Sequence, residues 1–342
     1  MKILMSAAAV VFSVLLFIFP QFSVSGSVEG VRLCIDVLLP SLFPFMIISS
    51  FISLCGAADF LSLLFIPVTR LLNLPDKTAA VWLSSFTGGF PSGAHSICSL
   101  YRLSAVSKQQ AEQLISCCVC SGPSFLILAV GSQMLGSAKT GILLFLSQII
   151  SVIIITAIFC RQGKQNGSAA PFKYLSFDKA LVSAVSDSAF SLINIFAFVL
   201  FFSVLTYVLN GNMPFSRFIV SFLEVTLGCR QAAILKNGLS VLFIAFLTGF
   251  GGVSVCFQIL SLARDHGLSP ARFWLIRIIN GVLCASVFKL LTLLFPACSP
   301  VFSHSLKQTA TVIWSVDRML GGICLASMLL LSLQKLDFDI KT

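Results

Sequence analysis

The amino-acid sequence predicts an all-α polytopic membrane protein, and three observations support this class. The chain has 342 residues, of which 57% are hydrophobic and only 10% are charged. Soluble domains carry about 25% charged residues, so this chain has too few to cover a soluble surface. Apolar runs of about 20 residues, the length that crosses a bilayer as a helix, recur from end to end. The short alternating strands of a transmembrane β-barrel are missing from the sequence pattern.

The first apolar run, residues 3–22, follows Lys2 and precedes the small residues Ser23 and Ser25. This arrangement resembles a cleaved signal peptide, but the run is also long enough to cross a membrane. In a polytopic chain we favour the second interpretation. We therefore expect residues 1–30 to form an uncleaved N-terminal transmembrane helix.

Ten further apolar segments bring the total to about 11, and they form two sets of five on either side of a polar linker, residues 161–179. The first set, residues 31–160, has segments near 34–55, 60–74, 79–100, 113–135 and 139–160. The second set, residues 180–335, has segments near 180–209, 214–228, 238–263, 272–297 and 309–333. A short tail, residues 336–342, ends the chain.

The two sets match in order, which indicates an internal duplication. Residues 87–90 in the third segment align with residues 248–250 in its counterpart, and residues 121–123 in the fourth align with Asn280 and Gly281. Because each set has an odd number of segments, the second set must enter the membrane from the opposite side. Such inverted repeats are typical of secondary transporters.

Glycine residues interrupt the third segment of each set, and the first of these breaks also contains Pro91. In hydrocarbon every backbone N–H and C=O has to be paired, so an unwound helix is tolerated only inside protein or beside a wet cavity. Unwinding also exposes half-helix ends, which attract ions. The alternative is close helix packing through glycine. Two breaks at matched positions favour a pair of re-entrant or discontinuous helices that face each other across a small polar site.

The breaks and the polar side chains near them are the candidate ligands of a solute. Some of them, such as His95 and Asn280, can instead be satisfied interior groups or helix contacts. The predicted substrate-binding residues are Thr87, Gly88, Gly89, Pro91, Ser92, Gly93, His95, Ser121, Gly122, Pro123, Thr248, Gly249, Gly251, Gly252, Ser254, Gln258 and Asn280.

Two acidic residues inside apolar segments are candidates for ion coupling. Glu224 lies in the stretch FLEVTLG, and Asp187 lies two turns into its segment. A carboxylate at membrane depth is costly unless it is neutralised, hydrated or paired, so it is a functional hypothesis by default. A structural ion pair of Glu224 with Arg277 or Arg318 is the alternative.

Other classes of function find little support in the sequence. The net charge of +10 comes from basic residues scattered over short connections, so no nucleic-acid partner is expected. Most of the twelve cysteines lie in apolar segments, and the single C-x-x-C in CCVC, residues 117–120, has no second pair or histidine at zinc spacing. We therefore expect no metal and no cofactor. Because P-loop, H-E-x-x-H and nucleophile-elbow patterns are missing, we expect neither an enzyme nor an ATP-driven pump.

Four stretches carry a resemblance to a known family. They are VLLPSLFPFMIISSFI at 37–52, the stretch 84–137 with GGFPSGA and SGP, FLEVTLG at 222–228 and FLTGFGGVSVCFQILSL at 246–262. On these stretches the chain resembles the YlbJ-like sporulation integral membrane proteins, which belong to the group with the nucleoside-transporter/FeoB Gate domain. It departs from the family pattern at Phe90, usually tyrosine, and at His95, usually lysine, so an amine is missing at that position.

The resemblance and the breaks lead to two hypotheses. The favoured one is a secondary transporter or permeation protein for a small polar solute, with nucleoside-like solutes among the candidates, coupled to H⁺ or Na⁺. The other is a scaffold or assembly protein that spore cortex or coat formation requires without transport. Both place the chain in the lipid bilayer as a multi-pass protein of the cell membrane, with the forespore and mother-cell membranes as candidates. Assembly into a homo-oligomer is compatible with both hypotheses.

The five-plus-five scheme predicts the sidedness of the termini. Lys2 and the linker around Lys173 should lie in the cytoplasm, and Thr342 should lie on the opposite side, because a repeat with an odd number of crossings inverts. Labelling of single cysteines, introduced on a cysteine-free background, by a membrane-impermeant reagent measures this directly. A cytoplasmic C-terminus would contradict the scheme.

Overall fold

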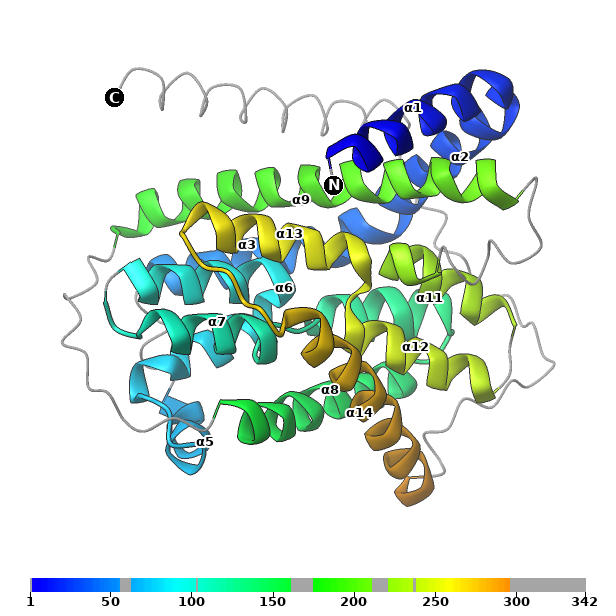
Figure 1. The fold of residues 1–342 in the computed structure, drawn as a ribbon. Coiled ribbons are helices and arrows are strands. Elements are labelled where there is room, and N and C mark those ends of the chain that lie inside the picture. Colours follow the sequence, from blue (N-terminus) through cyan, green and yellow to red (C-terminus); the bar gives the residue numbers. More distant parts are fainter. Residues whose placement is uncertain are drawn as a thin grey trace, which may run out of the picture.

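The computed structural model describes residues 2–55, 63–102, 104–160, 175–210, 221–235 and 238–295. All regular structure in these ranges is helical (Figure 1). Five helices there are long and apolar enough to cross a membrane: Pro20–Ile52, Ala138–Phe159, Phe177–Leu209, Gly238–Asp265 and Phe273–Leu294. The predicted all-α class is confirmed at this level. The expected segment 309–333, the tail and most of the linker lie outside the described residues, as do Arg318 and Thr342.

The N-terminal helix is shorter than expected, because α1 (Lys2–Ile18) ends before Pro20. Proline is favoured in the first helical turn, where its missing N–H is not needed, and Pro20 begins α2 (Pro20–Arg32). A π-helix, η1 (Leu33–Leu38), joins α2 to α3 (Leu39–Leu54) in one long rod. Pro40 cannot donate the usual bond to the carbonyl of residue 36, which accounts for the wider turn there.

The third predicted segment folds back on itself within α6 (Ala79–Arg102). Gly89 has φ 77° and ψ −159°, which no helix contains. Across this break, Ser96 Oγ donates to Ser84 Oγ at 2.8 Å. Twelve residues of straight helix would separate these side chains by about 18 Å. The two half-helices therefore form a hairpin at the glycine-rich stretch where the sequence predicts a re-entrant or discontinuous helix.

Short elements connect this hairpin to its neighbours. Before it come η2 (Leu63–Phe65), α5 (Ile66–Leu71) and η3 (Asp76–Thr78). After it, α7 (Lys108–Cys117) begins at a capping box, in which Ser107 and Gln110 each bond the other's backbone N–H. The chain is non-helical from 119 to 122 and continues as the π-helix η4 (Ser124–Met134) and as α8 (Ala138–Phe159).

The second half of the chain begins with the 34-residue helix α9 (Phe177–Asn210). The chain then reverses at Glu224, which has extended φ −135° and ψ 121°. Ser221 Oγ lies 3.5 Å from Gln231 Oε1, although ten residues of straight helix would hold them about 15 Å apart. The elements α11 (Val225–Ile234), α12 (Gly238–Phe250), α13 (Gly252–Asp265) and α14 (Phe273–Leu294) follow.

The same order of elements occurs twice, but in a different register from the one predicted. A long helix, a chain reversal, a broken helix and a 22-residue helix follow one another in each half, with α8 and α14 as the last members. The reversal at Gly89 therefore corresponds to the reversal at Glu224. By the same order, the break at 119–122 corresponds to the left-handed Gly251, not to Asn280 and Gly281. The predicted alignment of residues 87–90 with 248–250 is wrong.

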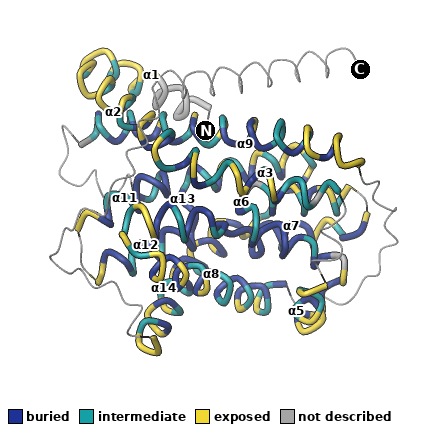
Figure 2. Tube along the Cα trace, turned by 180° about the vertical axis from the view of Figure 1, so that it is seen from behind, coloured by how far each residue is buried: buried dark blue, intermediate teal, exposed yellow. Residues whose placement is uncertain are grey.

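Two hydrophobic clusters hold the bundle together. One gathers α6, α7, α13 and the start of α14, and the other gathers α3, η4, α8, α9 and α12. The buried side chains that represent them are Trp82, Leu114 and Phe273 in the first and Leu144, Leu192 and Ile244 in the second. Figure 2 shows the buried residues along the middle elements and the exposed ones on α1, α5 and the outer turns. Apolar side chains such as Phe17 (86% exposed) and Val182 (71%) suit contact with lipid.

Candidate functional site

Each chain reversal packs against the broken helix of its own half. A Cβ atom on Gly89 would lie 3.0 Å from Gly122 N, and one on Gly122 would lie 3.2 Å from Gly89 N. In the second half, a Cβ atom on Gly252 would lie 2.9 Å from Val225 N, at the start of α11. Glycine is required at these points because backbone approaches backbone.

The two breaks also meet each other, and we call their meeting point the junction (residues 87–90, 119–122, 248–252, Arg277 and Asn280). Ser121 Oγ donates to the carbonyl of Thr248 at 3.4 Å. A Cβ atom on Gly251 would lie 3.1 Å from the ring of Phe90. Thr87 Oγ1 lies 3.0 Å from Ser49 Oγ on α3, which ties the first hairpin tip to the long helix. Many of the predicted site residues are thus brought together.

Arg277 lies at the centre of the junction and is fully buried. Its Nε donates to the Phe250 carbonyl at 2.9 Å, and its two Nη atoms donate to the carbonyls of Val119 at 2.6 Å and Gly249 at 2.9 Å. The guanidinium also lies 5.3 Å from the centre of the Phe90 ring. One side chain therefore pairs the carbonyls that both breaks set free.

Asn280, one turn further along α14, adds a second donor to the same place. Its Nδ2 donates to the Gly249 carbonyl at 2.9 Å. Its Oδ1 is buried and has no hydrogen-bond partner among the described residues, and the same holds for the Oγ of Ser85 in the first hairpin. Buried polar atoms without a protein partner usually bind water or a ligand.

Glu224 is 2% exposed, and the hydrogen-bond partner of its carboxylate among the described residues lies in α11. It is the N-cap of α11, where its Oε2 accepts a bond from Leu227 N at 2.7 Å. A carboxylate is favoured at this end of a helix by the helix dipole. The alternative hypothesis, an ion pair of Glu224 with Arg277, is wrong, because the guanidinium bonds carbonyl groups instead.

The other predicted residues lie at varying distances from the junction. Ser254 is buried in α13, Gln258 is half-buried one turn later, and His95 is exposed on the second half of α6. Ser92 Oγ donates to the Gly88 carbonyl at 3.4 Å, within the hairpin. Asp187 is half-buried on α9, which packs mainly against α2 and α3, so it does not belong to the junction.

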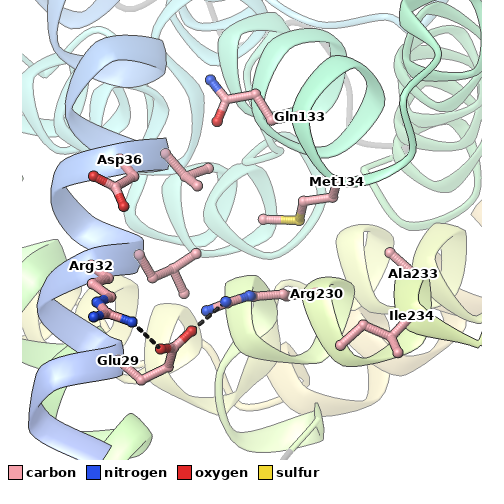
Figure 3. Close-up of a pocket in the computed structure, with 10 residues that line it drawn as sticks. Glu29, Arg32, Asp36, Gln133, Met134, Arg230, Ala233 and Ile234 are labelled. Atoms are coloured by element: carbon pink, nitrogen blue, oxygen red, sulfur yellow. Dashed lines mark ion pairs between the residues drawn. The ribbon is translucent and has the colours of Figure 1, made fainter. Parts of the chain in front are cut away.

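A second site, which we call the charged cavity, was not predicted. It has a volume of about 540 Å³ and lies between α2 with η1, the end of η4, and α11 (Figure 3). Its lining residues are Glu29, Arg32, Leu33, Asp36, Val37, Gln133, Met134, Arg230, Ala233 and Ile234. The charges of Glu29, Arg32 and Asp36 in a membrane-length apolar helix were the available sequence signal, because ionisable groups there are costly and tend to be functional.

Ion pairs join two elements of the charged cavity. Arg230 on α11 bonds Glu29 on α2, and Arg32 lies 4.0 Å from the same carboxylate. Figure 3 shows Glu29 between the two arginines, with Asp36 further along the same helix and Gln133 on the neighbouring one. The cavity thus lies between the first long helix and α11, the helix that Glu224 caps.

Comparison with known proteins shows one sequence similarity that bears on these sites. The sporulation integral membrane protein YlbJ of Bacillus subtilis (strain 168) is 24% identical over 318 residues, which cover 80% of this chain and 78% of that protein. This similarity supports the resemblance of the chain to the YlbJ-like membrane proteins. Together with the apolar helices, this supports a multi-pass location in the membrane. No family model matches the chain, so the Gate-domain part of the resemblance is not confirmed. No solved structure matches it.

The bonding of Arg277 predicts a stability defect. Arg277→Met keeps most of the side-chain volume but removes all three donors, and a buried carbonyl such as that of Val119 that loses its partner costs about 1–3 kcal/mol. We expect Arg277→Met to lower the thermal midpoint in detergent and the yield of folded protein. Arg277→Lys should have a thermal midpoint between those of Arg277→Met and the wild type, because an ammonium group lacks the planar donor geometry of a guanidinium.

Arg272→Gln is the matched control for Arg277, since Arg272 lies exposed at the start of the same helix. It should melt like the wild type. If Arg277→Met also melted like the wild type, the three carbonyls would not depend on the guanidinium.

Proposed function

We propose that the chain is a secondary transporter or permeation protein for a small polar solute, and not an enzyme, with the junction as the place where the solute passes. The observation that supports it best is the meeting of two unwound breaks and two chain reversals around buried polar atoms. Discontinuous helices that meet inside the membrane are a common design of solute sites in transporters. The unpartnered Asn280 Oδ1 and Ser85 Oγ are groups that a solute or its water would bond.

As a revision of the predicted five segments per repeat, the proposed architecture is a pair of inverted repeats with four elements each. In this scheme the long helix, the broken helix and the last helix of each half cross the membrane, while the chain reversal returns to its side of origin. Three crossings are an odd number, so the second half runs in the opposite sense. Alternating access would then come from movement of the two reversals against the fixed helices.

Glu224 is proposed to hold the coupling H⁺ or Na⁺. The carboxylate lies at a chain reversal beside Val225, whose backbone touches the break at Gly252. A bound cation or proton would weaken the hydrogen bond by which the Glu224 carboxylate caps α11. It would thereby change the contact of the chain reversal with the break at Gly252. Asp187 on α9 is the second proposed coupling residue, at a distance from the junction.

The proposed setting is the sporulation programme, because the protein to which the chain is similar is named for it. The cell membrane of a spore-forming host, in the forespore or mother cell, is the proposed location. A scaffold without transport is the alternative, and the next experiment separates the two.

A disulfide staple tests whether the first reversal has to move. In Ser49→Cys/Thr87→Cys, the new thiols replace hydroxyls that lie 3.0 Å apart and join the hairpin tip to α3. We expect purified protein in liposomes to take up one or more solutes from a mixture of nucleosides and amino acids, detected by mass spectrometry. Oxidation of the double variant should abolish this uptake, and reduction should restore it, because the staple blocks tip movement.

Ser84→Cys/Ser96→Cys is the matched control. It joins two residues whose hydroxyls lie 2.8 Å apart within one hairpin, so it leaves the hairpin free to move as a unit. Its uptake should survive oxidation. If uptake persists in the oxidised Ser49→Cys/Thr87→Cys variant, the hypothesis that the hairpin tip moves during transport is rejected. If the wild-type protein takes up no solute, the scaffold alternative is favoured.

A genetic test addresses Glu224 and the sporulation role together. Deletion of the gene in its spore-forming host should leave vegetative growth intact and reduce the count of heat-resistant spores. Glu224→Gln should fail to restore that count although the protein accumulates, because the amide oxygen still caps α11 but carries no charge. Asp178→Asn, at the exposed start of α9, should restore it. Full restoration by Glu224→Gln would exclude a coupling role.

A further inference from the structure

The charged cavity has a lining whose charges cancel. Glu29 and Asp36 are acidic, and Arg32 and Arg230 are basic, so the lining carries no net charge. Such a lining gives no long-range preference for cations or anions. At about 540 Å³, the cavity falls within the size range of small-molecule sites, which is roughly 300–1,000 Å³.

The charges are also separated along the cavity wall. Glu29 is bonded to Arg230 and lies 4.0 Å from Arg32, so the two guanidinium groups gather around one carboxylate. Asp36, one helical turn beyond Arg32, forms no ion pair with any described residue. The cavity therefore has a basic end with spare N–H donors and an acidic end.

Gln133 adds an amide oxygen to the lining from a second helix, and both helices are π-helices at this point. Asp36 belongs to η1, and Gln133 belongs to η4. π-helical turns occur frequently at functional sites, because they displace side chains from the regular helical positions. Two such elements contribute polar side chains to the lining of one cavity here.

We propose that the charged cavity binds a small zwitterion of the α-amino acid class. Its ammonium group is bound by the Asp36 carboxylate with help from Gln133, and its carboxylate is bound by the guanidinium groups of Arg32 and Arg230. Arginine is well suited to this because its planar fork matches a carboxylate. A solute with a single charge would leave one end of the cavity unmatched.

This inference rests on the proposed permeation function for its role, since the cavity would then be a vestibule on the way to the junction. The helix α11 connects them: Arg230 lines the cavity, and Val225 at the start of the same helix touches the break at Gly252. Binding itself is independent of transport and is measured without it.

The experiment uses the full-length protein in lipid nanodiscs, with the protein-forming α-amino acids added one at a time. We expect at least one of them to raise the thermal midpoint saturably, and its radiolabelled form to bind in equilibrium dialysis. Methylammonium, acetate and uridine, which represent a cation, an anion and a nucleoside, should neither bind nor compete. Asp36→Asn should weaken binding at least tenfold, and so should Arg230→Gln.

Asp178→Asn and Arg264→Gln, which change charges outside the cavity, should leave binding unchanged. Because Arg230→Gln also removes an ion pair, Asp36→Asn is the deciding variant. Absence of binding by every amino acid, equal binding of methylammonium, acetate or uridine, or unchanged binding by Asp36→Asn would overturn the inference. If an amino acid binds but is not taken up into liposomes, the binding inference stands and the permeation proposal is rejected.

Discussion

The fold depends on the pairing of backbone carbonyls at two unwound breaks by one buried guanidinium. In a bilayer a free carbonyl is costly, so a chain that breaks two helices inside its core must supply donors there. Arg277 does this for Val119 in one half and for Gly249 and Phe250 in the other. The last two are at the C-terminal end of α12, where the helix dipole favours a cation. Among the described residues, the charge of Arg277 is therefore stabilised by backbone dipoles and not by an acidic side chain.

The breaks could be predicted from the sequence, but their register could not, because glycine is needed for two different reasons. Gly89 and Gly251 have positive φ and form true breaks. Gly249 instead sits in a helix where a Cβ atom would lie 3.0 Å from the Cα of Gly281, so both are packing residues. The reversal at Glu224 has no glycine at its tip, since an extended residue with a capping side chain turns the chain there. Thr-Gly-Gly-Phe at 87–90 and Thr-Gly-Phe at 248–250 therefore indicated an alignment that the helices do not follow.

The two groups of charged residues were harder to predict, since each acts through contacts between distant parts of the chain. Arg277 was considered only as a partner for Glu224, and its bond to Val119 spans 158 residues. Glu29, Arg32 and Asp36 were not among the predicted site residues, and only the packing of α11 brings Arg230 to Glu29. Sequence patterns report helix faces and breaks well, because these are local. They do not report which carbonyl or carboxylate a long side chain will reach.

The helix α11 gives these features a common mechanical basis. It has ten residues and is held by electrostatic contacts at its start and just past its middle: Glu224 caps its first turn, and Arg230 pairs with Glu29 on α2. Its first residue, Val225, contacts the break at Gly252. A Cβ atom at Gly252 would lie 2.9 Å from Val225 N, so any side chain there would displace the backbone of α11. A short helix cannot tilt at one end without moving the other. We therefore expect a displacement of α11 that begins at Arg230 to change its contact with the break at Gly252, and one that begins at Glu224 to change its contact with the charged cavity.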